Sequence, residues 1–109
     1  MPVCLRRCVV LAAALVAAGC LSPTLPLPPP SEPEVTQVSE GVYRLSGSVT
    51  PRAEVYAFNV RTSFIDGQAT GDSGEYSFEV QAAPGDAIEL WYETRSRESQ
   101  ITEFEIPDP

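Results

Sequence analysis

The chain has 109 residues with no histidine and no lysine, and its 15 acidic against 7 basic side chains give a formal net charge of −8 at pH 7. Without histidine the chain cannot form a Ser–His–Asp triad, a Cys–His dyad or an ordinary zinc site. A carboxylate pair of the glycosidase kind remains chemically open, but it needs a deep cleft that a small domain does not provide. We therefore predict that the protein is not an enzyme and that it has no cofactor, no metal and no nucleic-acid partner, because its charge repels polyanions.

Residues 1–19 have the pattern of an export signal. Arg6 and Arg7 are the only charges before Glu32, and Val9–Ala18 is an unbroken apolar run of ten residues. That run is about half of the roughly 20 residues that a membrane-spanning helix needs. The segment therefore predicts a cleaved signal peptide and not an anchor helix.

The six residues that end at Cys20, Leu-Val-Ala-Ala-Gly-Cys, resemble the lipobox of bacterial lipoproteins. The resemblance implies cleavage before Cys20, attachment of lipid to its thiol, and anchoring of the mature protein to a membrane that it does not span. Leu21 stands where an aspartate would signal retention in the inner membrane, so the resemblance favours the outer membrane. The alternative is a plain secretory signal cut after Ala18 or Gly19, which would leave Cys20 as a free thiol.

The part of the chain that would remain after cleavage keeps one cysteine and is strongly acidic. Cys4 and Cys8 lie in the segment to be removed, so no internal disulfide can form afterwards. All fifteen carboxylates but only five arginines follow Cys20, a formal charge of about −10. The simplest interpretation is a solvated, soluble surface; divalent-cation binding by Asp66 and Asp72 is the alternative.

Residues 20–33 are dominated by proline, with Pro28, Pro29 and Pro30 in succession. Proline fixes φ and favours the extended polyproline II conformation, so we predict a stiff tether. At about 3.1 Å per residue it would hold the following domain roughly 40 Å from the membrane.

Residues 34–109 predict a single all-β domain of six or seven short strands in two packed antiparallel sheets. Apolar side chains alternate with polar ones in three segments, which is typical of half-buried strands. The alternating apolar residues are Tyr43, Leu45 and Val49, then Tyr76, Phe78 and Val80, then Ile88, Leu90 and Tyr92. Turn signals separate the strands: Thr50-Pro51, Asp66-Gly67, Asp72-Ser73-Gly74 and Pro84-Gly85-Asp86.

The segments that begin at Leu45, Thr70 and Ala83 follow a "G-x-V … A-x-V … D-x-x-G-x-F-x-F … P-G-D-x-I-x-L" rhythm. This rhythm resembles the carboxypeptidase regulatory-like and bacterial Ig-like β-sandwich modules over about Gly41 to Tyr92. The resemblance implies a sandwich of transthyretin or immunoglobulin type. Such modules serve as spacers, adhesion units or binding appendages, and the resemblance brings no catalytic residues to this chain.

The candidate binding residues are Tyr56, Phe58 and Trp91. Both faces of the segment from Ala53 to Val60 are apolar, and only one can meet the core. If Val55 and its inward neighbour Ala57 face the core, Tyr56 and Phe58 face outward; the same alternation places Trp91 outward between two glutamates. In sandwiches of this type the third and sixth strands commonly lie near each other, so the three rings would form one patch.

Two other interpretations of these rings remain open. Leu25, Leu27 or the tail around Phe104 and Ile106 could cover the outer face, or the opposite register could place the rings in the core. The sequence thus predicts a lipid-anchored, non-catalytic structural or protein-interaction module of the cell envelope, with a carbohydrate-binding module as the alternative. Its expected partners are the membrane, through the N-terminal lipid, and an envelope protein or glycan.

Overall fold

The computed structural model describes residues 25–108, and seven strands lie in this range. The strands are β1 (Glu34–Ser39), β2 (Val42–Ser48), β3 (Glu54–Asn59), β4 (Ile65–Ala69), β5 (Glu75–Gln81), β6 (Ala87–Glu93) and β7 (Thr102–Glu105). The predicted signal peptide, residues 1–19, and the predicted lipidation site Cys20 lie outside the described residues. Within the described range, no helix has the length and apolar character needed to cross a membrane.

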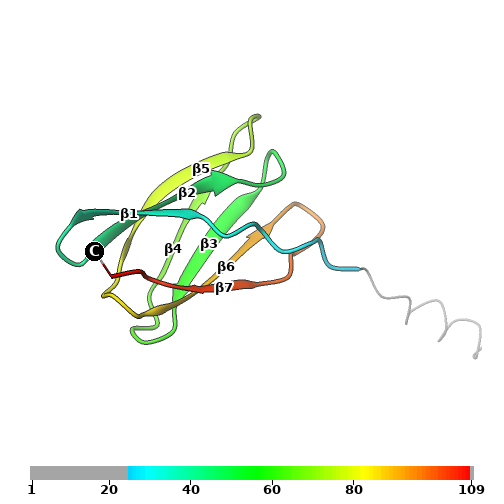
Figure 1. Ribbon diagram of the computed structural model, residues 1–109. Coiled ribbons are helices and arrows are strands. Elements are labelled where there is room, and N and C mark those ends of the chain that lie inside the picture. Colours follow the sequence, from blue (N-terminus) through cyan, green and yellow to red (C-terminus); the bar gives the residue numbers. More distant parts are fainter. Residues whose placement is uncertain (1–24, 109) are drawn as a thin grey trace, which may run out of the picture.

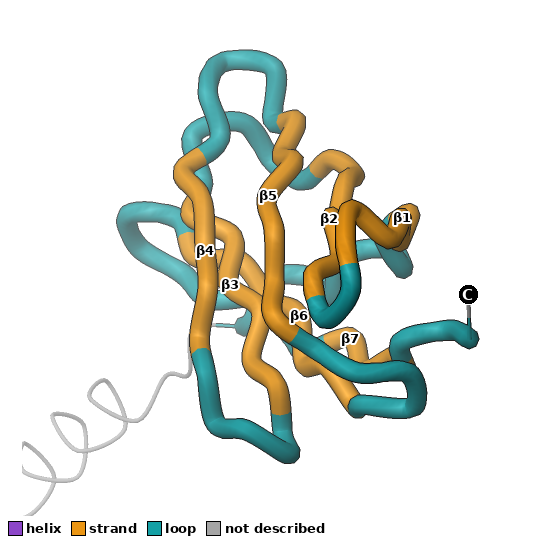
Figure 2. Tube along the Cα trace, turned by 90° about the vertical axis from the view of Figure 1, so that its left-hand side faces the viewer, coloured by secondary structure: helices purple, strands orange, loops and turns teal. Residues whose placement is uncertain are grey.

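The strands form two antiparallel sheets packed face to face, with the orders β1-β2-β5 and β4-β3-β6-β7 (Figures 1 and 2). Hairpins join β1 to β2, β3 to β4 and β6 to β7, and the chain changes sheet between the other successive strands. The prediction of a small antiparallel β-sandwich of about seven strands is confirmed. In the second sheet β4 is paired to β3 and forms one edge of the sheet.

The core lies between the sheets and follows the predicted alternation. Leu45 in β2, Val55 in β3 and Leu90 in β6 are completely buried. Their neighbours in the same strands point outward, because successive side chains of a strand alternate between its two faces. The other buried apolar residues are Tyr43, Ala53, Ala57, Tyr76, Val80, Ala82, Ile88, Tyr92, Phe104 and Ile106.

The predicted turn at Asp66-Gly67 is wrong, because both residues lie inside β4. Gly67 is paired with Tyr56 of β3, and the aromatic ring lies over it: a Cβ atom at Gly67 would come within 3.0 Å of the ring and 2.7 Å of the Val55 carbonyl. The glycine therefore marks a close approach inside a strand and not a chain reversal. The other three turn signals do fall between strands.

The proline-rich segment packs against the sandwich from Leu27 onwards. Leu27 forms a short parallel bridge with Ser99, in which its amide donates to the Glu98 carbonyl and its own carbonyl accepts from the Gln100 amide. The carbonyl of Pro28 accepts from Tyr92 Oη at 3.1 Å, and Pro30 and Pro33 are buried. The packed body of the domain therefore begins near Leu27 and not at Glu34.

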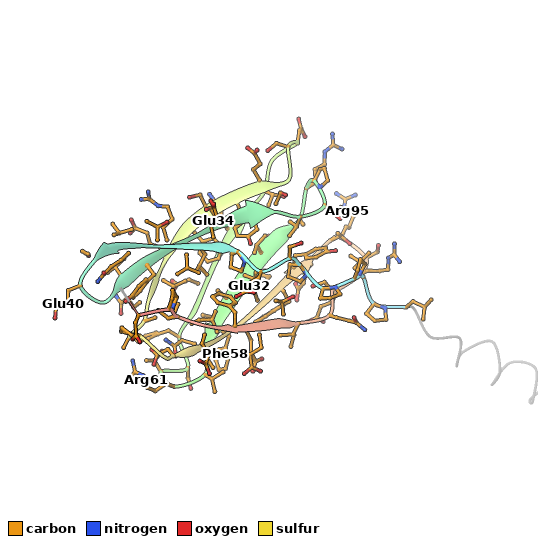
Figure 3. The ribbon with its side chains drawn as sticks, in the orientation of Figure 1. Glu32, Glu34, Glu40, Phe58, Arg61 and Arg95 are labelled. Carbon is orange, nitrogen blue, oxygen red and sulfur yellow. The ribbon has the colours of Figure 1, made fainter. Side chains whose placement is uncertain are left out.

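This arrangement fixes the end of the sandwich at which the chain enters. Figure 1 shows the described chain beginning beside the β6–β7 loop, and the C-terminus at the opposite end. Arg95 lies at the first end, whereas Glu40 and Arg61 lie at the second (Figure 3). The four-stranded sheet runs along the side of the molecule between these two ends.

Candidate functional site: an aromatic and acidic sheet face

The predicted site residues lie on the outward surface of the β4-β3-β6-β7 sheet, which we call the aromatic face. Val55 and Ala57 are buried in the core, whereas Tyr56 and Phe58 are half-buried and point to the other side of β3. Trp91 occupies the equivalent half-buried position in β6. The register expected for the third strand and its pairing with the sixth are both confirmed.

Tyr56 and Trp91 are directly opposite each other in the β3–β6 ladder, and their rings stack. The ring centroids are 5.6 Å apart and the planes are inclined by 26°. On its other side the Tyr56 ring covers Gly67 of β4. Three strands thus hold the phenol ring in place, and its position depends on a glycine that the sequence pattern had assigned to a turn.

The Tyr56 hydroxyl donates a hydrogen bond to the carboxylate of Glu54, two residues earlier on the same face of β3. This bond is the main cause that raises the pKa of Tyr56 to about 12; burial and the negative charges of Glu54 and Glu93 act in the same direction. The phenol therefore stays neutral over the physiological pH range.

Phe58 and Ile65 extend the apolar surface towards the far end of the sheet. They are directly opposite each other in the β3–β4 ladder, and Ile65 is 57% exposed. Figure 3 shows Phe58 and Glu34 on opposite sides of the sandwich. Ile65 was not predicted as a site residue, because its strand was interrupted in the sequence analysis by the supposed turn.

A hollow of about 390 Å³ lies beside Tyr56 over β4. It is lined by Glu54 and Tyr56 of β3 and by residues 65–69 of β4. A larger hollow of about 690 Å³ belongs to the other side of the molecule and is lined mainly by serine and glutamate, including Glu32 and Glu34 (Figure 3).

The indole nitrogen of Trp91 is buried and has no hydrogen-bond acceptor among the described residues. Most buried polar groups in folded proteins have a partner, and an unpaired one costs roughly 1–3 kcal/mol. The centre of the aromatic face thus contains an unsatisfied donor. This unpaired N–H and the exposed apolar side chain of Ile65 are both features that lower the stability of the isolated protein.

Five glutamates surround these rings. Four strands contribute to the aromatic face, and none of them contains an arginine or a lysine. The glutamates on either side of Trp91 were expected from the sequence. Those of β7 were not, although they alternate with Phe104 and Ile106 in the same regular way. The outward carboxylates are those of Glu54, Glu89, Glu93, Glu103 and Glu105.

The segments that could have covered the rings lie elsewhere. Phe104 and Ile106 are buried in the core, Leu27 packs against the core, and Leu25 is 73% exposed.

Asp66 and Asp72 do not converge on a metal: Asp72 pairs with Arg52 at 3.1 Å, and no group of three potential metal ligands occurs among residues 25–108.

The protein is thus a small antiparallel β-sandwich, and the outward surface of its four-stranded sheet carries aromatic and acidic side chains. Comparison of the chain with known proteins gives no match to a family model, to a curated protein or to a solved structure. The resemblances to bacterial lipoproteins and to carboxypeptidase regulatory-like or Ig-like modules therefore stay predictions. The β-sandwich itself rests on the observed strand order.

Proposed function

We propose that this chain is a lipid-anchored, non-catalytic interaction module of a bacterial cell envelope, and that its aromatic face holds a protein partner. The observation that carries the proposal is the Tyr56–Trp91 stack on the outward side of the central strands β3 and β6. Large aromatic side chains on an accessible sheet face are typical anchors of protein interfaces, because each buries much area at little cost in conformational entropy.

The proposed address is the outer membrane, through lipid on Cys20. Leu27 is bound to the sandwich by two backbone hydrogen bonds, so the spacer between Cys20 and the domain is only about seven residues. At roughly 3.1 Å per residue this spacer reaches about 20 Å, half of the distance that the whole proline-rich segment would span. The domain would therefore lie close to the membrane, with the β6–β7 loop towards it.

The inventory of side chains supports a non-catalytic role. The chain has no histidine, and its remaining cysteine after cleavage would be the lipid-bearing one. Of the carboxylates of the aromatic face, Glu54 and Glu93 line a hollow of about 400 Å³ together with Arg52 and Arg95. A glycosidase pair would need a deep cleft that encloses the substrate bond, so this arrangement favours a non-catalytic role.

The alternative, a carbohydrate-binding module, draws on the same rings. Flat aromatic rings flanked by carboxylates can stack on sugar rings and accept hydrogen bonds from hydroxyls. However, a centroid separation of 5.6 Å at 26° is an offset stack in which each ring covers part of the other. A sugar platform needs free ring faces, so this geometry favours a protein partner over a glycan.

Photo-crosslinking in the native host tests the proposal with the full chain. A photoreactive phenylalanine analogue replaces Ile65 on the aromatic face or Val38 in β1 of the other sheet, both of which are exposed. We expect one defined protein adduct from position 65 and none from position 38. The adduct should disappear in the Trp91→Ala variant.

The Trp91→Ala variant must keep its fold for this result to count. Because Trp91 is half-buried on the outer face, we expect its loss to cost about 2–3 kcal/mol, from the stacking contact together with the buried part of the ring. A much larger loss of stability would make Trp91 a structural residue. Equal adducts from positions 65 and 38, or none, would contradict the proposed function.

A further inference from the structure

Two pairs of glutamates lie directly opposite each other on the aromatic face. Glu54 of β3 is paired with Glu93 of β6, and Glu89 of β6 is paired with Glu103 of β7. Residues opposite each other in an antiparallel ladder have Cβ atoms about 5 Å apart, and like charges in that position are destabilising. The sheet therefore carries two repulsive pairs, which lie on either side of Trp91 along β6.

The other sheet shows the arrangement that stability favours. Arg44 of β2 is opposite Glu79 of β5, and the guanidinium donates to the carboxylate at 3.1 Å. The chain thus places a compensating arginine in one sheet and none in the four strands of the other. Arg52 and Arg95, in the adjoining loops, line a hollow with Glu54 and Glu93, but no ion pair joins them among the described residues. Departures from locally stable pairing are expected at functional sites, where a partner supplies the missing compensation.

We infer that the aromatic face recognises a basic protein segment, one that presents arginine or lysine side chains to the two glutamate pairs. The inference rests on the proposed function and specifies the chemistry of its partner. A guanidinium or ammonium group between two carboxylates relieves their repulsion. Its aliphatic stem can pack against the half-buried side chains of Tyr56 and Trp91.

The same charges argue against other occupants of the face. A second copy of this chain would bring five more carboxylates against the first five, so the face does not suit self-association. Sugar hydroxyls cannot neutralise the glutamate pairs. A divalent cation would need a convergent set of ligands, which does not occur in the described part of the chain.

The only tryptophan of the chain makes a direct test possible, because Trp91 stands at the centre of the face. The full chain in mild detergent is titrated with octa-arginine, with octa-citrulline as the neutral control of the same shape, while Trp91 emission is recorded. We expect a saturable change with octa-arginine alone, weakened at high salt by screening.

Two double variants with the same change in net charge separate the face from the overall charge. Glu89→Gln with Glu103→Gln removes one pair on the face, and Glu34→Gln with Glu75→Gln removes two carboxylates from the other sheet. We expect at least tenfold weaker octa-arginine binding for the first variant and a less than twofold change for the second. Equal weakening by both, or binding of octa-citrulline as tight as that of octa-arginine, would overturn the inference.

The outcome is independent of the crosslinking result. If position 65 yields a defined protein adduct but octa-arginine does not bind at the face, the interaction module stands and the basic character of its partner is wrong. If octa-arginine binds at the face but position 65 yields no adduct, the chemical preference stands without a partner in the envelope.

Discussion

Arg61 binds the buried carboxylate of Asp86 with two nitrogens: Nε lies 2.6 Å from one oxygen and Nη2 lies 3.0 Å from the other. The same carboxylate accepts hydrogen bonds from the Asn59 amide at 3.0 Å and the Ala83 backbone amide at 2.8 Å. These contacts join the β3–β4 loop to the β5–β6 loop. They lie at the end of the sandwich away from the chain entrance (Figure 3).

We expect Asp86 to be the main source of acid sensitivity. The hydrogen bond from Arg61 is the chief cause that holds the pKa of Asp86 well below its usual 3.8, and the bonds from Ala83 and Asn59 add to it. A carboxyl whose pKa is lower in the folded state stabilises the fold fully above its unfolded pKa. This contribution is lost as the pH falls from about 4 towards the folded value.

The Asp86→Asn variant tests this assignment, with Asp72→Asn as its control. Loss of the charged acceptor should reduce the free energy of unfolding by about 2 kcal/mol at pH 7 and flatten its dependence on pH below 4. Asp72 also pairs with an arginine, but that pair is exposed, so its loss should change little. Urea unfolding at pH 2.5 to 7 measures both; similar curves for the two variants would refute the role of Asp86.

Tyr56 should titrate later than an ordinary tyrosine. Its pKa is raised to about 12, chiefly by the hydrogen bond to Glu54, so the variant Glu54→Gln should bring it closer to 10. Because the folded pKa is the higher one, this tyrosine stabilises the fold below pH 10 and loses that effect as the pH rises towards 12. NMR of ¹³C-labelled tyrosine reports the titration of each ring. An unchanged Tyr56 titration in Glu54→Gln would contradict the assigned cause.

The sequence could predict those parts of the fold that depend on neighbouring residues in the chain. The period-two pattern around Leu45 and Leu90 specified which side chains face the core, and it placed Trp91 outward. This pattern could not predict the contacts of Leu27–Pro33. The residues that this segment contacts, such as Tyr92 and Thr102, are more than 60 positions away in the sequence. Proline content alone cannot distinguish a free tether from a segment packed on a sheet.

The acidic character of the site was visible in the sequence, but its pairing was not. Alternating glutamates in each strand show that carboxylates share a face. Which carboxylate stands opposite which depends on the register between β6 and β7, and a shift by one residue would have separated Glu89 from Glu103. The same holds for Gly67, whose role depends on the ring that covers it from β3.

Three glycines form a graded test of the backbone. Gly74 has a φ of +77°, and a Cβ atom there would lie 2.2 Å from the Val49 carbonyl oxygen. Gly41 has a φ of +78° with free space around it, and Gly71 has neither constraint. Gly71→Ala should therefore leave stability nearly unchanged, and Gly41→Ala should cost about 1 kcal/mol for the left-handed backbone. Gly74→Ala should cost at least about 1 kcal/mol more, because the strand connection must move.

Thermal unfolding of the three alanine variants ranks them directly. The order Gly71, Gly41, Gly74 separates the cost of the backbone angle from the cost of the clash. A Gly74→Ala variant as stable as Gly41→Ala would show that the loop before β5 can move without loss, and that the contact with Val49 does not hold it.

Removing charge from the aromatic face should stabilise the isolated protein. Glu89→Gln relieves the repulsion with Glu103 while keeping the size of the side chain, so we expect the free energy of unfolding to rise by about 0.5 kcal/mol. Glu79→Gln, which breaks the ion pair with Arg44, is the control and should give no gain. The gain should shrink in 1 M salt, where the Debye length is about 3 Å. Stability that falls in Glu89→Gln at low salt would mean that the glutamate pairs are not repulsive, and the case for a basic partner would lose its main support.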